Sequence, residues 1–599
     1  MRTIHKRWWA WCWTACTLGA GAGEFTLENG GVGRYNLQLT AGTQWRAYAP
    51  GVEQYGATLN KVVADVPKGQ LSGFTGGSDL NYEKGKPIST VLKASFDAEL
   101  RKDHWGLYLS GLAWHDLEQG HRSVAYGNYP NQFTPNAPLS DHGFSSSAQF
   151  SGAQLREFYA QGRTTWGESS TLQARVGRQL LDWGGSQLTP GGINMAVHPA
   201  DYAAAVRPGV LANEGRLPLG MMHFKLGTGT SWDYEGYWAL ESRNTEIPGC
   251  GTYFDVSAYS PQGCDFTAVD LSANPAFANF TENKYLASGI YVHRNADIKA
   301  SGQHLGLAAQ YTTNSKATVW KWYALDTSAS TPSLRVTLNS AAMLGDPRRG
   351  SYANLYVDHI RLYGMSVQSQ LNASDKLFGE ITLRPHQIIS YNATDLLSAF
   401  LLQRGPLALY RGALDVPVGG SFDAYERFRV VTGSLGASKT TSGLLGANRT
   451  VLMGEWAFSH VNGLPSPDQV RFGRPIAYGA ASYLTSTGPS ACSPAPSKTC
   501  SLDGYVTSTA TSLRAYAALG YANLIPGAMV TPSLAITMDL SGYAYDGLVS
   551  QGRRIVRPGV RVDWAQSRFV EYQFNRFSGG AYNLVADRDF HSLVAGVRF

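Results

Sequence analysis

The chain contains many segments of about ten residues in which every second side chain is apolar, and this is the length of a transmembrane barrel strand. Three examples place apolar side chains at Ala94, Phe96, Ala98 and Leu100, at Val560, Val562 and Trp564, and at Val570, Tyr572 and Phe574. A period of two puts alternate side chains on opposite faces of a sheet. One such strand would also suit a soluble sandwich, so the number of segments decides. We estimate roughly 16 to 18 of them between residues 34 and 599.

Composition excludes two other classes of protein. Only 16% of the 599 residues are charged, against ~25% in soluble domains, and 12% are aromatic. So many aromatic side chains exclude a disordered chain. No stretch of ~18 or more apolar residues follows residue 22, which excludes a bundle of membrane helices. The pattern therefore predicts an all-β fold, a transmembrane antiparallel outer-membrane β-barrel of about 16–18 strands with long loops and short helical plug or loop elements.

Residues 1–22 are predicted to be a signal peptide. Basic residues at Arg2, Lys6 and Arg7 precede an apolar stretch over residues 8–18 and an A-x-A cleavage site at residues 20–22. A short apolar helix kept in the mature chain, or lipid attachment at Cys16, are the alternatives. Residues 23–599 would then form the barrel in the outer membrane of a Gram-negative bacterium. The net charge of +6 falls further on cleavage, which argues against a nucleic-acid partner.

Four cysteines outside this segment form two local pairs, Cys250 with Cys264 and Cys492 with Cys500. Four cysteines allow three connectivities, and short loops close most easily, so two local disulfides in loops are favoured. They would form on an oxidising side of the membrane. A zinc site is the alternative, but the chain has no C-x-x-C motif, so we expect neither a metal nor another cofactor.

Aromatic residues cluster near the ends of the alternating segments, as in the aromatic girdles at the two membrane surfaces. The clusters are Trp45 with Tyr48, Trp105 with Tyr108, and Trp232 with Tyr234, Tyr237 and Trp238. Ordinary enrichment of aromatic residues in strands is the alternative explanation.

The last segment ends in an aromatic ring. Leu593, Ala595, Val597 and Phe599 lie on one face of it. A barrel must pair its last strand with its first, because an open edge in lipid leaves backbone groups unsatisfied. The ending resembles the C-terminal signature of outer-membrane barrel proteins, which implies recognition by the barrel-assembly machinery, with outer-membrane lipid as the surroundings.

Much of the chain lies outside minimal strands, above all in residues 50–89, 118–154, 184–220 and 244–285. Two stretches are predicted to be helical. One begins at Thr394 as N-cap and ends before Gly405 and Pro406, with Leu396, Leu397, Phe400 and Leu401 on one face. The other runs from His198 to Arg207, with Pro199 in its first turn and Asp201 early in it. They are either plug elements inside the barrel or helices in external loops.

Arg178 interrupts the alternation set by Leu172, Ala174 and Val176. A cation facing lipid at mid-bilayer costs ~2–4 kcal/mol. We therefore expect either a bulge at Gly177, which would turn Arg178 into the lumen to pair with Asp182, or a position at the rim. The candidate lumen or plug residues are Arg178, Asp182, Trp183, His198, Asp201, Arg207, Leu397, Phe400 and Arg404.

No motif for metal-dependent, nucleophilic or nucleotide chemistry occurs in the chain. The pairs His115–Asp116 and Asp358–His359 consist of neighbours, which point to opposite faces of a strand and cannot form a dyad. We expect no catalytic residues and no enzymatic activity.

The chain resembles a proteobacterial family known only as a domain of unknown function. The resemblance rests on residues 176–179, 183–184, 192–194, 198–201 and 207–209, together with residues 36–46, 79–82 and 250–254. Gly185 stands where the family usually has Glu, and His198 where it usually has Asn. The resemblance implies an outer-membrane barrel that often occurs with a periplasmic lipid-carrier-like protein and an exporter of the resistance–nodulation–division type.

This resemblance implies a channel or transporter for a small, hydrophobic or lipid-like molecule between periplasm and exterior. The alternatives are a non-conducting structural or assembly barrel and an enzyme that modifies lipid at the rim.

Overall fold

The first and last long strands pair with each other and close the sheet into a barrel. β2 (Val32–Arg46) and β28 (Phe590–Arg598) are antiparallel neighbours, and the backbone of Phe599 exchanges two further hydrogen bonds with Leu37. β1 (Gly23–Thr26) pairs with β2 beyond this seam. Without β1 the main sheet of the described chain has 18 strands, all joined in antiparallel order, at the upper end of the predicted range.

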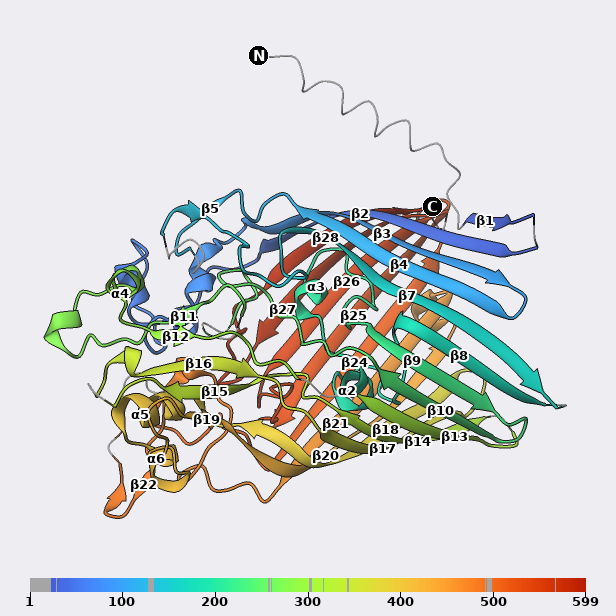
Figure 1. The fold of residues 1–599 in the computed structure, drawn as a ribbon. Helices are drawn as coiled ribbons and strands as arrows, with labels where there is room; N and C mark the ends of the chain where they lie inside the picture. Colours follow the sequence, from blue (N-terminus) through green and yellow to red (C-terminus); the bar gives the residue numbers. More distant parts are fainter. Residues whose placement is uncertain are drawn as a thin grey trace.

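The computed structural model describes residues 23–28, 30–127, 134–167, 169–256, 259, 261–300, 304–315, 317–341, 344–490, 492, 498–565 and 567–599 (Figure 1). The predicted signal peptide at residues 1–22 lies outside these residues. The other barrel strands are β3 (Pro87–Lys102), β4 (Trp105–Asp116), β7 (Ser151–Trp166), β8 (Ser170–Gln179), β9 (Leu219–Gly227), β10 (Trp232–Ala239), β13 (Leu305–Thr312), β14 (Thr318–Thr327), β17 (Ile360–Gln370), β18 (Asp375–Ser390), β20 (Tyr425–Thr441), β21 (Arg449–Asn462), β24 (Thr509–Ala522), β25 (Ala528–Ser541), β26 (Arg554–Trp564) and β27 (Arg568–Ser578).

The predicted alternation is confirmed by the two faces of the wall. On β3, Phe96 is 41% exposed on the outer face, whereas Lys93 and Ser95 are 3% and 8% exposed on the inner face. Charged residues of β26 and β27 also face inward and pair there, as Arg561 does with Asp563 and Glu571. The outer face is thus apolar, as lipid requires, and the inner face is polar.

The aromatic prediction is confirmed only in part. Trp105, Trp232, Tyr234 and Trp238 are exposed on the outer face of the barrel. Tyr108 and Tyr237 point inward instead: Tyr108 stacks on Tyr159, and Tyr237 is 4% exposed. Tyr108 is three positions from Trp105, and Tyr237 is one position from Trp238, so the period of two places them on the opposite face.

Short turns join the strands at one end, near both described termini, and long loops gather at the other end (Figure 1). These loops carry a second sheet in the order β11-β12-β16-β15-β19 and two small hairpins, β5–β6 and β22–β23. Their bounds are β5 (Ser123–Val124), β6 (Ala137–Pro138), β11 (Phe266–Thr267), β12 (Val292–Arg294), β15 (Ser333–Leu338), β16 (Gly350–Leu355), β19 (Ser421–Asp423), β22 (Leu484–Thr485) and β23 (Gly488–Pro489). The predicted disulfides Cys250–Cys264 and Cys492–Cys500 both form in this region.

The loops also contain the helices α4 (Glu282–Ser288), α5 (Ala393–Leu402) and α6 (Pro406–Tyr410). The described chain also contains short turns of 3-10 helix, at Val52–Gln54, Leu59–Lys61, Gly77–Asn81, Pro275–Phe277, Pro347–Arg349, Leu444–Gly446 and Ile476–Tyr478. No described helix has both the length and the apolar character needed to cross a membrane.

The helix predicted over residues 394–404 is present as α5, with different ends. Asn392, rather than Thr394, is the N-cap, and its side chain accepts a hydrogen bond from the backbone N–H of Asp395. The helix ends at Leu402 because Gln403 adopts the left-handed conformation, with φ of 51°.

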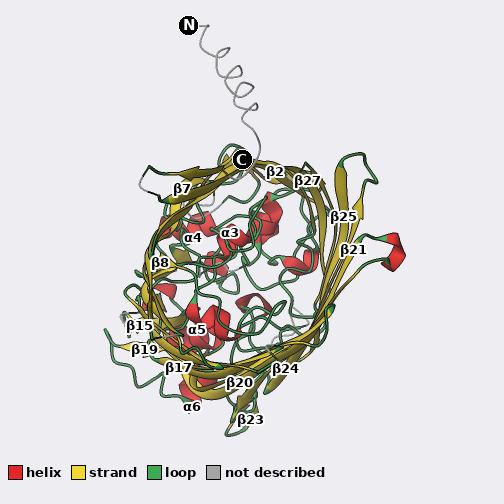
Figure 2. Ribbon diagram, turned by 90° about the vertical axis from the view of Figure 1, so that its right-hand side faces the viewer, coloured by secondary structure: helices red, strands yellow, loops and turns green. Residues whose placement is uncertain are grey.

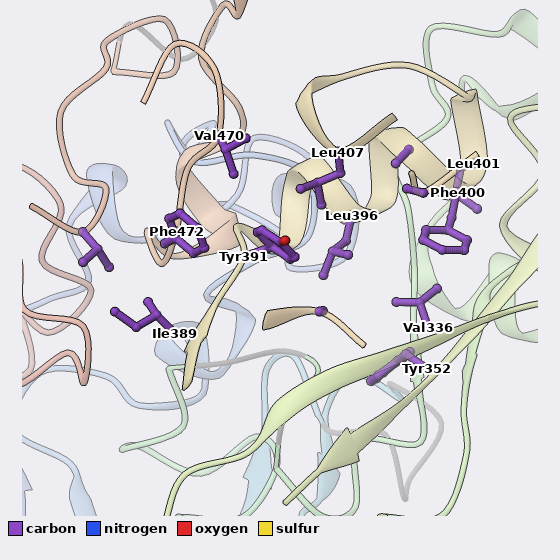
Figure 3. Packing of buried hydrophobic residues seen from close by; sticks show 14 of the residues in the cluster. Val336, Tyr352, Ile389, Tyr391, Leu396, Phe400, Leu401, Leu407, Val470 and Phe472 are labelled. Carbon is purple, nitrogen blue, oxygen red and sulfur yellow. The ribbon is translucent and has the colours of Figure 1, made fainter. Parts of the chain in front are cut away.

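The packing of α5 shows why the chain is helical here. Leu396, Phe400 and Leu401 pack against Val336 and Tyr352 of the second sheet (Figure 3). Leu397 is partly buried in the same cluster and Arg404 is exposed. Of the two positions considered for this helix, the loop position is the one observed (Figure 1). Leu397, Phe400 and Arg404 therefore lie in the loops and do not form a plug inside the barrel.

The two faces of β3 can be tested with one pair of neighbouring substitutions. We expect Phe96→Arg to destabilise the folded barrel by about 2 kcal/mol or more, because it places a cation against hydrocarbon. Asp97→Arg places the same residue on the inner face and should change stability much less. Urea unfolding of each variant in lipid vesicles measures the difference, and equal destabilisation by both would contradict the assigned faces.

Candidate functional site

One long loop folds back into the barrel. Residues 180–218, here called L3, connect β8 to β9 and contain α2 (Gly192–Val197) and α3 (Tyr202–Ala205). Seen end-on in Figure 2, α3 lies inside the ring of strands. The helix predicted from His198 to Arg207 is therefore shorter than expected. Asp201 is its N-cap and accepts a hydrogen bond from Ala204 N at 2.8 Å, so His198 and Pro199 lie before the helix.

Two wall carboxylates hold the first part of L3. Glu455 on β21 accepts hydrogen bonds from the backbone N–H groups of Gln187, Leu188 and Thr189, at 3.1, 2.5 and 3.1 Å, and from the Ser186 hydroxyl at 2.6 Å. Hydrogen bonds to an ionised carboxylate are roughly twice as strong as neutral ones. A loop segment without regular structure is thereby fixed to the wall.

Glu380 on β18 binds L3 in the same way. It accepts from the backbone N–H groups of Gly185, Ser186 and Ile193 at 2.8, 3.3 and 3.1 Å. Glycine is required beside it, because a Cβ at Gly192 would lie 1.7 Å from a Glu380 carboxylate oxygen and the Gly192 φ is +65°. Glu380 and Glu455 are 8% and 1% exposed, so both carboxylates are largely withdrawn from water.

Cations on another part of the wall hold the second part of L3. Lys93 on β3 forms an ion pair with Glu214 at 2.7 Å. Arg156 on β7 donates to the carbonyl oxygens of Asn213 and Arg216, both at 2.7 Å. A β-bulge after Leu155 supplies this arginine as an extra inward residue, because Leu155 and Glu157 pair with consecutive residues of β4.

Two residues of L3 itself, Trp183 and His198, also hold the loop in place. Trp183 is 2% exposed, packs beside Tyr237 and Tyr323, and donates from Nε1 to Glu235 at 2.8 Å. His198 is fully buried; Nε2 accepts from Leu181 N at 2.8 Å, and Nδ1 lies 3.1 Å from the carbonyl oxygen of Leu217. These contacts define the neutral tautomer, and burial lowers the pKa of His198 to about 3.

Asp201 and Arg207 attach L3 to the neighbouring loop through one residue. Asp201 accepts from the Ser147 hydroxyl at 2.6 Å, and Arg207 donates to the Ser147 carbonyl oxygen at 2.5 Å. The Arg207 guanidinium also lies 4.1 Å from the centre of the Trp114 ring. Burial raises the pKa of the Asp201 carboxyl.

The prediction that Arg178 turns into the lumen is wrong. β8 keeps its register through Gly177, and Arg178 shares the outer face with Val176 and with its partner Phe158, which are 45% and 55% exposed. Arg178 is next to the last residue of β8, at the rim, and pairs with Glu241 at 3.0 Å instead of with Asp182. Asp182 pairs with Arg216 at 2.8 Å. The rim position removes the cost of a lipid-facing cation.

Two cavities flank L3. The first, here called the L3–L8 cavity, has a volume of about 130 Å³ and lies between L3, residues 328–331, residues 542–553 (L8) and the wall. The second, here called the vestibule, has about 500 Å³ and lies near the short-turn end, lined by Asn213 and Glu214 of L3 and by wall residues such as Gln38 and Tyr108. L3 therefore lies between the L3–L8 cavity and the vestibule.

The sequence did not single out the wall residues that hold L3. Lys93 is one of several polar residues on its strand, and nothing in the sequence marks Lys93, Glu380, Glu455 or Arg156 as a partner of L3. The only available signal was the parity of each residue within its strand, which identifies the face but not the partner. Neighbouring His115 and Asp116 do face opposite ways, since His115 contacts Ser151 and Asp116 accepts from Ser89.

A closed antiparallel barrel with an apolar outer face, outward aromatic rings and an internal loop defines an outer-membrane β-barrel protein, located in the outer membrane of a Gram-negative bacterium. The chain belongs to the family described as a protein of unknown function (DUF1302), whose profile matches residues 6–599. The resemblance inferred from the sequence is thereby confirmed. No curated protein matches the chain.

Several solved structures are similar to the chain at low identity. OccAB1 of Acinetobacter baumannii is 10% identical with a TM-score of 0.41, covering 97% of this chain and 98% of that one. The BenF-like porin of Pseudomonas fluorescens Pf-5 is 8% identical with a TM-score of 0.41, covering 96% and 99%. OpdK of Pseudomonas aeruginosa, solved with vanillate, is 10% identical with a TM-score of 0.36, covering 95% and 98%.

Because the His198 imidazole of L3 is buried, we expect the stability of the protein to depend on pH. The folded pKa of the imidazole lies below the ordinary 6.5, so the unfolded chain binds the proton first and stability is lost as pH falls from about 6.5 toward 3. His198→Asn, which keeps one donor and one acceptor, should lessen this loss. Thermal unfolding between pH 7 and pH 4 measures it, with His115→Asn as the exposed control. Equal pH slopes for all three proteins would contradict the assignment.

Proposed function

We propose that this protein is a channel or transporter that passes a small, hydrophobic or amphipathic molecule between periplasm and exterior, with L3 as the constriction. The observation that carries the proposal is the position of L3, between the L3–L8 cavity and the vestibule and attached to the barrel wall on both sides. A molecule that crosses the barrel must pass this loop.

The kind of attachment supports a constriction. L3 packs apolar side chains against one part of the wall, where Leu181, Ile193 and Val197 join a cluster with Leu219 and Leu362. Elsewhere hydrogen bonds and ion pairs to single wall side chains hold it. Such contacts fix a loop in place without filling the lumen around it.

The lining of the L3–L8 cavity supports an amphipathic cargo. Apolar side chains such as Met195, Leu548 and Val549 share it with polar groups such as Thr432, Ser434 and Ser512. A periplasmic lipid-carrier-like protein as donor or acceptor of the cargo is part of the proposal. The second candidate is a barrel with a structural role, whose lumen stays closed. The burial of Leu181, Ile193 and Val197 of L3 against the wall favours this second candidate.

Conductance across planar bilayers distinguishes the two. We expect the purified protein to form channels, and Glu455→Ala to raise the single-channel conductance about twofold or more, because four hydrogen bonds to L3 are lost. Glu571→Ala is the matched control, since this inward carboxylate pairs with Arg561 and not with L3.

A barrel that conducts neither as the natural chain nor with Glu455→Ala would favour the structural role. The variants must first show the migration of a folded barrel on gels without heating, so that a failure to fold is recognised.

A further inference from the structure

Two arginines of the L3–L8 cavity lack a carboxylate partner. Arg384 on β18 and Arg514 on β24 both line the cavity and are 7% and 8% exposed. Neither has an ion pair within the described part of the chain. In contrast, Arg561 of the lumen pairs with Asp563 and Glu571, and Arg156 donates to three carbonyl oxygens of L3. Because a buried uncompensated charge is costly, this arrangement needs an explanation.

Arg384 is held by neutral acceptors only. Its guanidinium donates to the Thr382 hydroxyl at 3.1 Å and to the Gly192 carbonyl oxygen of L3 at 3.0 Å. The register of β18 against β20 shifts directly after it, between Arg384 and Gln387, where Pro385 cannot join the ladder. These contacts orient the Arg384 guanidinium but do not neutralise its positive charge.

Arg514 has fewer contacts still. Among the described residues it has one hydrogen bond, to the Ser512 hydroxyl at 3.4 Å, and Thr432 and Ser434 add further hydroxyls to the cavity wall. A guanidinium carries five N–H donors in a planar fork that matches a carboxylate. Most of the Arg514 donors are therefore open to a molecule in the cavity.

The acidic groups nearby form no ion pair with these cations in the described chain. Asp539, the carboxylate that acts most strongly on Arg514, pairs with Arg553 at 2.7 Å. The carboxylate oxygens of Glu380 are engaged by the backbone of L3, and so are those of Glu455. Asp546 of L8 lines the cavity but accepts from Leu548 N at 3.0 Å and forms no ion pair with either arginine. Burial raises the pKa of Asp546, which favours its neutral form.

L3, L8 and β17 contribute apolar side chains to the cavity, beside polar ones such as Ser186 and Thr189. Met195 and Ala196 of L3, Leu548 and Val549 of L8, and Ile360 of β17 supply the apolar surface. A cavity lined by two cations, several hydroxyls and several aliphatic groups suits a ligand with an acidic group on an apolar body.

We propose that the L3–L8 cavity binds amphipathic organic anions, with Arg384 and Arg514 receiving the acidic group and the aliphatic side chains receiving the apolar body. The inference rests on the proposed channel function and narrows its cargo to this class. It makes the two arginines specificity-determining residues, whereas Glu380 and Glu455 position L3.

Hexanoate is a suitable probe, with hexanol and hexylammonium as the neutral and cationic counterparts of the same length. We expect hexanoate to bind the detergent-solubilised protein in titration calorimetry, and to block the potassium chloride current of single channels. Arg384→Gln and Arg514→Gln should each raise the hexanoate concentration for half-block, and the dissociation constant, at least tenfold. Arg561→Gln removes the same charge from a compensated lumen arginine and should leave both within twofold.

The outcomes separate this inference from the channel function. Channels that conduct but respond equally to hexanoate and hexanol, or keep their hexanoate block in both arginine variants, would overturn the anion site and leave the channel intact. Calorimetric binding of hexanoate that is lost in the arginine variants, without any conductance, would support the site and overturn the channel. Absence of hexanoate binding by calorimetry to the folded protein would overturn the site whatever the conductance.

Discussion

Every backbone N–H and C=O group inside a bilayer needs a partner, because an unsatisfied one costs several kcal/mol in hydrocarbon. The pairing of β2 with β28 meets this requirement for the two strands that would otherwise be edges. Closure then divides the side chains of the wall into two sets. Those outside must be apolar, and those inside are free to carry charge. Arg178 shows how strict the division is, since it faces outward only at the rim and beside Glu241.

The polar interior in turn makes L3 possible. A loop without regular structure exposes backbone groups that cannot be buried unpaired. Glu380 and Glu455 satisfy N–H groups of L3, and Arg156 satisfies its carbonyl oxygens. Side chains of the wall thus do for L3 what caps do for a helix end. The loop can cross the lumen because several strands of the surrounding sheet supply hydrogen-bond donors and acceptors to its backbone.

The wall could be predicted from the sequence in more detail than the site. A period of two, a predicted signal peptide and an alternating last segment suffice to predict a barrel, its inner and outer faces and the range of its strand number. They fail where the period is interrupted. A bulge lies in β7 at Arg156, where no glycine marks it, whereas β8 keeps its register through Gly177. The two local disulfides were predictable because loop closure depends on sequence distance.

Pairings across the lumen follow no such local rule. Glu380 and Gly185 are 195 residues apart, and Glu455 and Leu188 are 267 apart. Which inward residue meets which part of L3 depends on the path of the loop, and that path depends on packing around Trp183 and His198. Candidate residues within L3 can be named from the sequence because the strand alternation stops there and a short helix is predicted. Their partners on the strands keep the alternation, so nothing in the sequence marks them.

Buried charged side chains of this fold are stabilised in several ways. His198 avoids an uncompensated charge by staying neutral, and Lys93 avoids it by pairing with Glu214. Arg471 in the loops pairs with Asp395 through two hydrogen bonds of 2.6 and 2.7 Å. Arg156 and Arg474, which have no ion pair among the described residues, each donate to three or more backbone carbonyl oxygens. In the cavity beside L3, Arg384 donates to one carbonyl oxygen of the described chain and Arg514 to none. The anion site proposed for this cavity gives these two charges a role.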